Sequence, residues 1–284
     1  MLRIDKVLRP KSLREALEIF AEDPELKPFA GGTDLMVQLQ DSSRKIRLID
    51  ISGIPELRYL RLDGSKLLIG GNMTHAEIAG SKLVDKNAPL IAQSSAVMGG
   101  PAIRNRATIG GNVGNSSPVA ESFPTLIAHG AEVVMVSIRG KRRMLVEDFH
   151  FGPGKNALEQ GELILGFEIP VVVANFCGFY ERLGSRAAMT ITKVGVAFAA
   201  NLKSNRLQDV RIALSAVAPK VIRAPESERI LEGNEISEKL VNLAAEVLVT
   251  ECKPISDFRS TCDYRQDMVG ELFRKGMSEV IHGI

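Results

Sequence analysis

Apolar residues near the start of the chain repeat at the spacing of an α-helix. They stand at positions i, i+3, i+4 and i+7, which places them on one face of a helix. These residues are Leu13, Ala16, Leu17 and Phe20. Ser12 and Glu15 have the order of a capping box at its beginning. The pattern predicts an amphipathic helix that starts after Ser12.

Strand-like and helical patterns then alternate as far as about residue 170. Runs typical of strands are RKIRLIDIS, LRYLRL, KLLIGG and AEVVMVSIRGKRRMLVEDF, the last folding into a hairpin that turns at Arg139 and Gly140. Two stretches between these runs, APLIAQSSAVMGG and ESFPTLIAHG, are helical in pattern. The second helix is expected to begin near Pro124 and to end at Gly130.

Longer strands of antiparallel type follow Pro170. They are GFYERL, VGVAFAANL and DVRIALSAVAP. Apolar positions at helical spacing then predict helices over 237–249 and 263–277. This change of pattern places a domain boundary near residues 171–176.

Two glycine-containing stretches, 30–34 and 108–112, have no apolar face to bury. Glycine permits left-handed backbone and close approach of a ligand, and successive free N–H groups form an anion-binding nest. We therefore interpret both stretches as loops that flank one pyrophosphate, the second lying between the two predicted helices. Hydroxyl and amide side chains beside them suit phosphate and sugar, and Asp34 or Glu121 suits a ribose hydroxyl. These side chains are Thr33, Thr108, Asn112, Asn115 and Ser117.

Ordinary tight turns are the alternative explanation for each glycine pair. Neither stretch has the GxGxxG or GxxxxGK[ST] spacing, so neither a Rossmann nor a P-loop site is predicted.

The composition and charge of the chain exclude some classes of function. The 284 residues are 45% hydrophobic and 25% charged with a net charge of +2, which predicts a folded protein without a nucleic-acid partner. No apolar run reaches the length of a membrane span, and the beginning MLRIDKVLRP lacks the apolar core of a signal peptide. A cytoplasmic protein is the expectation. Three scattered cysteines and four scattered histidines give no metal-binding spacing, and the basic run RGKRR is expected only to decorate the hairpin tip.

Several motifs together resemble the FAD-binding (medium) subunits of molybdenum hydroxylases, the family of carbon monoxide dehydrogenase medium chains and xanthine dehydrogenase FAD subunits. The motifs are AGGTDL, ATIGGNVGNSSP, IGGNMTHAEI, ELILGFEIP and PISDFRSTCDYRQDMV, which span almost the whole chain. The resemblance implies an α+β fold with two FAD-binding subdomains of the vanillyl-alcohol-oxidase (PCMH) type, residues 1–55 and 56–173. A C-terminal α+β domain with an antiparallel sheet, residues 174–284, would follow.

The resemblance also implies which residues hold FAD. In the first stretch they are Pro28, Phe29, Ala30, Gly31, Gly32, Thr33, Asp34 and Leu35. In the second they are Thr108, Ile109, Gly110, Gly111 and Asn112, both stretches being expected to wrap the pyrophosphate. Asn115, Ser117 and Glu121 would lie toward the ribityl and adenosine side, and Ile164 and Arg182 at the flavin ring. No catalytic side chain and no metal ligand is expected, and FAD would be the only redox centre.

Two departures from the family pattern bear on these roles. Glu121 stands where Asp is usual. Met189 and Thr190 stand where xanthine dehydrogenases have two acidic residues, so the route for NAD is expected to differ.

The function implied is electron transfer inside a complex. A large partner subunit with the molybdenum cofactor would oxidise substrate, a small partner with two iron–sulfur clusters would relay electrons, and FAD here would pass them to NAD or another acceptor. Two alternatives remain open: a self-contained FAD-dependent oxidoreductase, and a non-catalytic nucleotide-binding assembly module. A yellow, flavin-containing preparation would exclude the module.

Overall fold

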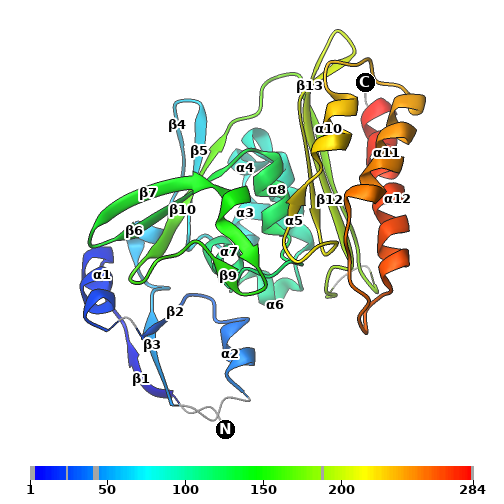
Figure 1. Cartoon of the computed structure of the whole chain (residues 1–284). Coiled ribbons are helices and arrows are strands. Elements are labelled where there is room, and N and C mark those ends of the chain that lie inside the picture. The colour runs from blue at the N-terminus through cyan, green and yellow to red at the C-terminus, as the bar shows by residue number, and fades with distance from the viewer. Residues whose placement is uncertain (1–3, 24, 41–44, 187–188, 283–284) are drawn as a thin grey trace.

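The computed structural model describes residues 4–23, 25–40, 45–186 and 189–282. Figure 1 shows an N-terminal sheet, a central sheet and a C-terminal sheet in succession across the molecule, with helices between and beside them. This arrangement confirms the predicted α+β fold and its antiparallel C-terminal sheet. None of the described helices is long and apolar enough to cross a membrane.

The N-terminal sheet is parallel and has the strand order β1-β3-β2. Its strands are β1 (Ile4–Leu8), β2 (Lys27–Phe29) and β3 (Ile46–Asp50), connected through α1 (Leu13–Glu22) and α2 (Leu35–Gln38). The apolar face predicted for α1 is buried. Ser12 accepts the Glu15 N–H at 3.2 Å, but the Glu15 carboxylate accepts the N–H of Lys11 instead, so only half of the capping box forms.

The central sheet is antiparallel, with the order β4-β5-β10-β6-β7. Its strands are β4 (Leu60–Asp63), β5 (Lys66–Gly70), β6 (Glu132–Ser137), β7 (Gly140–Leu145) and β10 (Leu163–Pro170). Alternating side chains of β6 are buried on both faces. Val133 packs with the helices that lie between this sheet and the C-terminal sheet, whereas Val134 packs with α1.

The central helices lie between the central and C-terminal sheets (Figure 1). They are α3 (His75–Ala79), α4 (Lys82–Asn87), α5 (Pro89–Val97), α6 (Pro101–Arg104), α7 (Ile109–Asn115) and α8 (Ser122–Ala128). The remaining short elements are η1 (Pro55–Leu57), α9 (Val146–Phe149), β8 (His150–Gly152) and β9 (Lys155–Asn156).

The C-terminal sheet has the order β11-β12-β13-β14 and is covered on both faces. Its strands are β11 (Phe176–Leu183), β12 (Val194–Lys203), β13 (Arg206–Ser215) and β14 (Ile222–Arg223). Ala197 and Ala199 face the central helices, and Phe198 faces the outer helices. The outer helices are α10 (Pro225–Leu231), α11 (Glu238–Glu251) and α12 (Cys262–His282). The two long helices predicted from periodicity are therefore confirmed.

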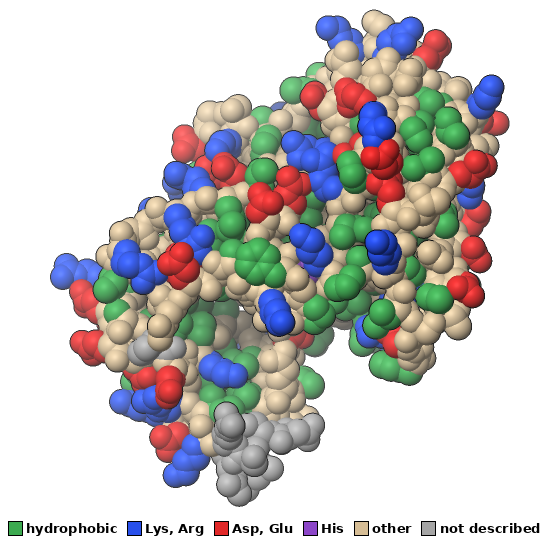
Figure 2. Space-filling model, in the orientation of Figure 1, with side chains coloured by type: hydrophobic (Ala, Val, Ile, Leu, Met, Phe, Trp, Pro, Cys, Tyr) green, Lys and Arg blue, Asp and Glu red, His purple; other side chains and the backbone are tan. Residues whose placement is uncertain are grey.

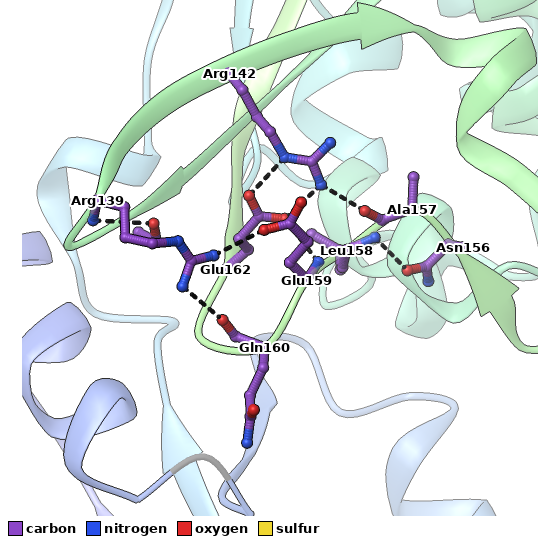
Figure 3. Close-up of polar contacts among 9 residues, drawn as sticks. Arg139, Arg142, Asn156, Ala157, Leu158, Glu159, Gln160 and Glu162 are labelled. Carbon is purple, nitrogen blue, oxygen red and sulfur yellow. Dashed lines mark hydrogen bonds and ion pairs between the residues drawn. The ribbon is translucent and has the colours of Figure 1, made fainter.

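The basic hairpin between β6 and β7 is pinned by ion pairs to the segment that leads into β10 (Figure 3). Arg142 binds Glu162 in a bidentate pair with two N–O distances of 2.6 Å. Arg139 binds Glu159 at 3.0 Å. The Glu162 side chain is only 4% exposed, and the hydrogen bond from Arg142 lowers the pKa of its carboxyl. The RGKRR run thus fastens this segment to the sheet.

The second glycine stretch was expected to be a loop, and this expectation was wrong. Residues 109–115 form the helix α7, with Thr108 as its N-cap and Ser116 in the left-handed conformation at its end. The Thr108 hydroxyl accepts the Gly111 N–H at 3.1 Å, which supplies the start signal. A good cap and packing against β10 outweigh the low helix propensity of its glycines.

Candidate functional site

The loop between β2 and α2 carries a run of free backbone donors. Within the described part of the chain, no acceptor pairs with the N–H groups of the five residues Gly31–Leu35. Gly32 has φ +73°, a conformation that glycine adopts without strain. Successive N–H groups in such a turn form a concavity that binds anions. The first glycine stretch therefore has, in the described part of the chain, free donors of the kind that the predicted nest requires.

The second glycine stretch has no free donors at its beginning. The N–H of Ile109 donates to the Met73 oxygen at 3.0 Å, and that of Gly110 to the Gly71 oxygen at 2.9 Å. The Gly111 N–H is taken by its cap. The interpretation of this stretch as a second nest was wrong, because its donors are consumed by the cap and by the segment that follows β5.

Three glycines allow chain segments to touch. A Cβ on Gly31 would overlap the backbone oxygen of Arg106. A Cβ on Gly110 would lie 2.6 Å from the Gly71 oxygen, and one on Gly71 would lie 2.5 Å from the Ile164 oxygen. These contacts bring the turn before α7 against the loop between β2 and α2, and they link α7 to β10 through Gly71, which sequence reasoning missed. The motif IGGNMTHAEI, which contains Gly71, was the available signal.

Gly111 and Asn112 differ from these packing glycines. Among the described residues, and apart from the backbone of its own helix, a Cβ on Gly111 would meet within 4 Å only the Thr108 hydroxyl, at 2.9 Å, and Gly111 is exposed. Asn112 Oδ1 is buried without a hydrogen-bond partner among the described residues. Buried polar atoms normally have a hydrogen-bond partner. A polar ligand bound at this exposed backbone would supply the partner that Asn112 Oδ1 lacks.

Asn115 connects α7 with the nest loop. Its Nδ2 donates to Asp34 Oδ2 at 3.0 Å, and its Oδ1 accepts from Gln38 Nε2 at 3.0 Å. Desolvation raises the pKa of the Asp34 carboxyl. The resemblance placed Asn115 beside FAD, whereas the structure shows both of its amide atoms bound to protein. The role of Gln38 gave no signal in the sequence.

Ile164 lies on β10 beside α7, where its Cδ1 would be 3.6 Å from a Cβ on Gly114. It is 8% exposed. Ser117 accepts the Val119 N–H at 3.4 Å in the turn after α7. Both residues thus flank the same helix.

Glu121 and Arg182 bind one another. Arg182 Nη1 lies 3.0 Å from Glu121 Oε1, and the Thr192 hydroxyl donates to the same oxygen at 3.0 Å. The side chains of Arg182 and Glu121 are 8% and 11% exposed. Burial raises the pKa of Glu121, while the charge of Arg182 opposes that shift. Thr192 is a partner that sequence reasoning missed.

The remaining predicted residues lie in the nest or directly before it. Ala30 is buried, Phe29, Thr33 and Leu35 are half-buried, and Pro28 is exposed at the middle of β2. Figure 2 shows the surface hollowed between the part that carries the N-terminal sheet and the central body of the molecule.

These features fit a dinucleotide. They are five N–H groups for phosphate and a buried amide oxygen, all without partners among the described residues, and an open glycine on the neighbouring helix. Fold and site together define the class, a nucleotide-cofactor-binding α+β protein without a Rossmann motif.

Comparison with known families identifies the group within that class. Residues 3–172 match the family described as the FAD binding domain in molybdopterin dehydrogenase, and residues 180–280 match the CO dehydrogenase flavoprotein C-terminal domain. The chain belongs to this family of oxidoreductase subunits, and its cofactor is FAD.

Individual relatives cover almost the whole chain. The xanthine dehydrogenase FAD-binding subunit of Escherichia coli O157:H7 is 29% identical over 277 residues, 96% of this chain and 94% of the relative. The glyceraldehyde dehydrogenase medium chain of Sulfolobus acidocaldarius is 30% identical over 275 residues, 96% of this chain and 97% of the relative. A carbon monoxide dehydrogenase structure from Hydrogenophaga pseudoflava superposes with a TM-score of 0.94 at 28% identity, covering 98% of this chain and 97% of that one.

Proposed function

We propose that this chain is the electron-transfer subunit of a multi-subunit molybdenum hydroxylase. It would assemble with a large subunit that holds the molybdenum cofactor and a small subunit that holds two iron–sulfur clusters. FAD held by this chain would supply the redox chemistry for passing electrons from those clusters to NAD or another acceptor. Support for a complex comes from relatives that are themselves named as subunits or medium chains.

The observation that carries the proposal is the run of five N–H groups over Gly31–Leu35 that have no acceptor in the described part of the chain. In the proposed role these groups donate to the FAD pyrophosphate, because a nest compensates phosphate charge without a lysine or arginine. Gly111 keeps the neighbouring surface of α7 open, and Asn112 Oδ1 accepts from the cofactor. Thr33, Thr108 and Ser117 hold the surrounding backbone or add hydroxyl contacts.

Glu121 and Arg182 have a structural role. Each neutralises the other, and the pair fastens β11 to the beginning of α8. Ile164, on β10 next to α7, contributes an apolar surface for the flavin ring.

The first experiment is an absorption spectrum of the purified chain, followed by release and quantification of flavin. About one FAD per chain is expected. A folded chain that neither retains nor takes up FAD would contradict the role of the nest and favour an assembly module.

The second experiment tests the partners. The chain is co-expressed with the candidate large and small subunits of its own source and purified through a tag on this chain, with metal and flavin analysis. Co-purification of molybdenum and iron with FAD is expected. Substrate oxidation by the metal-free chain alone would instead support the self-contained oxidoreductase.

A further inference from the structure

Helix α2 has little packing of its own. None of its four residues, Leu35–Gln38, is buried, and Val37 is 62% exposed. The N–H groups of Met36 and Gln38 donate to the Gly32 and Asp34 oxygens, each at 3.0 Å. A turn of this length is marginal in water without outside support. What fixes it must come from its neighbours.

Asn115 supplies such support from the other FAD-binding subdomain. One of its amide atoms contacts Asp34, just before α2, and the other contacts Gln38, at the end of α2. The two contacts therefore bracket the helix at both ends. They reach it from the last residue of α7, which is itself fixed by its cap and its packing against β10.

The side-chain amide of Asn115 is chemically suited to making both contacts. Asp34 offers only acceptors when ionised, and Gln38 uses its Nε2 as a donor, so the partner between them must donate on one side and accept on the other. Asn does both. Asp would set two carboxylates against one another, Ser is too short to reach both partners, and Ala would lose both contacts.

We propose that Asn115 is a positioning residue that holds the Gly31–Leu35 nest in its anion-binding shape by clamping both ends of α2 to α7. The inference rests on the proposed function, because the purpose of the clamp is to preorganise the loop for FAD. It assigns Asn115 no direct contact with the cofactor. Preorganisation lowers the ordering cost at binding, so its loss appears chiefly as faster release.

The test uses Asn115→Ala, Gln38→Ala and, as a matched control, Gln40→Ala. Gln40 is exposed just beyond α2, and its side chain makes no hydrogen bond within the described part of the chain. An exchange variant, Asp34→Asn with Asn115→Asp, reverses donor and acceptor while keeping net charge. The carboxylate that it introduces at position 115 can still accept from Gln38.

Hydrogen–deuterium exchange is measured first, in protein from which FAD has been removed. Asn115→Ala should speed exchange of the Met36, Gln38 and Leu39 amides by about tenfold, since two modest hydrogen bonds are lost. Gln38→Ala should produce part of this effect, and Gln40→Ala and the exchange variant should remain near wild type. Unchanged exchange in Asn115→Ala would overturn the clamp.

The rate of FAD release after dilution is measured second, by recovery of flavin fluorescence. Release should be about tenfold faster in Asn115→Ala and near normal in the control Gln40→Ala. Faster exchange without faster release would overturn the link to FAD. If the wild type holds no FAD, the proposed function fails, while the exchange measurement still decides whether the clamp exists.

Discussion

The guanidinium of Arg182 on β11 lies 3.0 Å from the carboxylate of Glu121 at the beginning of α8, measured from Nη1 to Oε1. Both side chains are almost fully buried. The pair joins the C-terminal sheet to the central helices, and Thr192 shares its carboxylate oxygen. Charges removed from water in this way are tolerated because each has a partner.

Breaking this pair should destabilise the fold strongly. In Arg182→Gln, Glu121 keeps its desolvated site but loses its cation, and we expect the free energy of unfolding to fall by about 3–5 kcal/mol. Urea denaturation at pH 7 measures the loss. The double variant Arg182→Gln with Glu121→Gln removes both charges and should recover part of the stability. A single variant as stable as wild type would refute the proposed strength of the pair.

Glycine substitutions should separate packing from cofactor binding. Gly111→Val points a side chain into open space except at the Thr108 hydroxyl. The chain should therefore fold, but its FAD content should fall by at least about tenfold. Gly110→Ala instead forces a Cβ against the Gly71 backbone, and we expect poor folding. Circular dichroism and flavin content are measured for both. Full FAD occupancy in folded Gly111→Val would remove Gly111 from the site.

The sequence was sufficient where a pattern is local. The buried face of α1 and the hairpin at Arg139 and Gly140 follow from periodicity and turn chemistry. The family resemblance carried the overall fold, since it spans segments far apart in the chain. A contact such as Gly31 with Arg106 depends on how those segments pack, and periodicity contains no signal for it.

Polar side chains of the site were harder to interpret. Glycine and asparagine around α7 are weak helix formers, so the composition favoured a loop, and only the cap on Thr108 and tertiary packing reveal the helix. Asn115 and Glu121 have the chemistry of cofactor ligands. Whether such groups face a ligand or one another is decided by neighbours distant in sequence, here Asp34 and Arg182.

The three thiols should differ in reactivity. Burial raises the pKa of Cys177 to about 11 and that of Cys252 to about 12. At pH 8 the thiolate fraction of Cys177 is then on the order of one in a thousand. Cys262, partly exposed at the start of α12, should be the thiol that iodoacetamide modifies first. Peptide mass analysis identifies the site, and Cys262→Ser should abolish rapid labelling; fast modification of Cys177 would contradict the prediction.

Buried neutral histidines should make stability depend on pH. Desolvation lowers the pKa of His75 to about 4 and that of His129 to about 3, from 6.5. Above pH 6.5 both are neutral in the folded and unfolded states and contribute nothing. As the pH falls below 6.5, the two histidines bind protons in the unfolded chain but stay largely neutral in the folded chain. The free energy of unfolding should therefore decrease, by up to about 1.4 kcal/mol per pH unit for each histidine.

The contribution of His129 can be isolated by substitution. Its Nε2 is buried without a hydrogen-bond partner among the described residues, and its ring stacks on Phe176 with centroids 5.5 Å apart. His129→Phe should therefore keep the stacking while removing the titration. Urea denaturation between pH 7 and 5 should show a shallower loss of stability for His129→Phe than for the wild type, by about 1.4 kcal/mol per pH unit below pH 6. Equal slopes in wild type and His129→Phe would mean that His129 takes up its proton in the folded chain as readily as in the unfolded one.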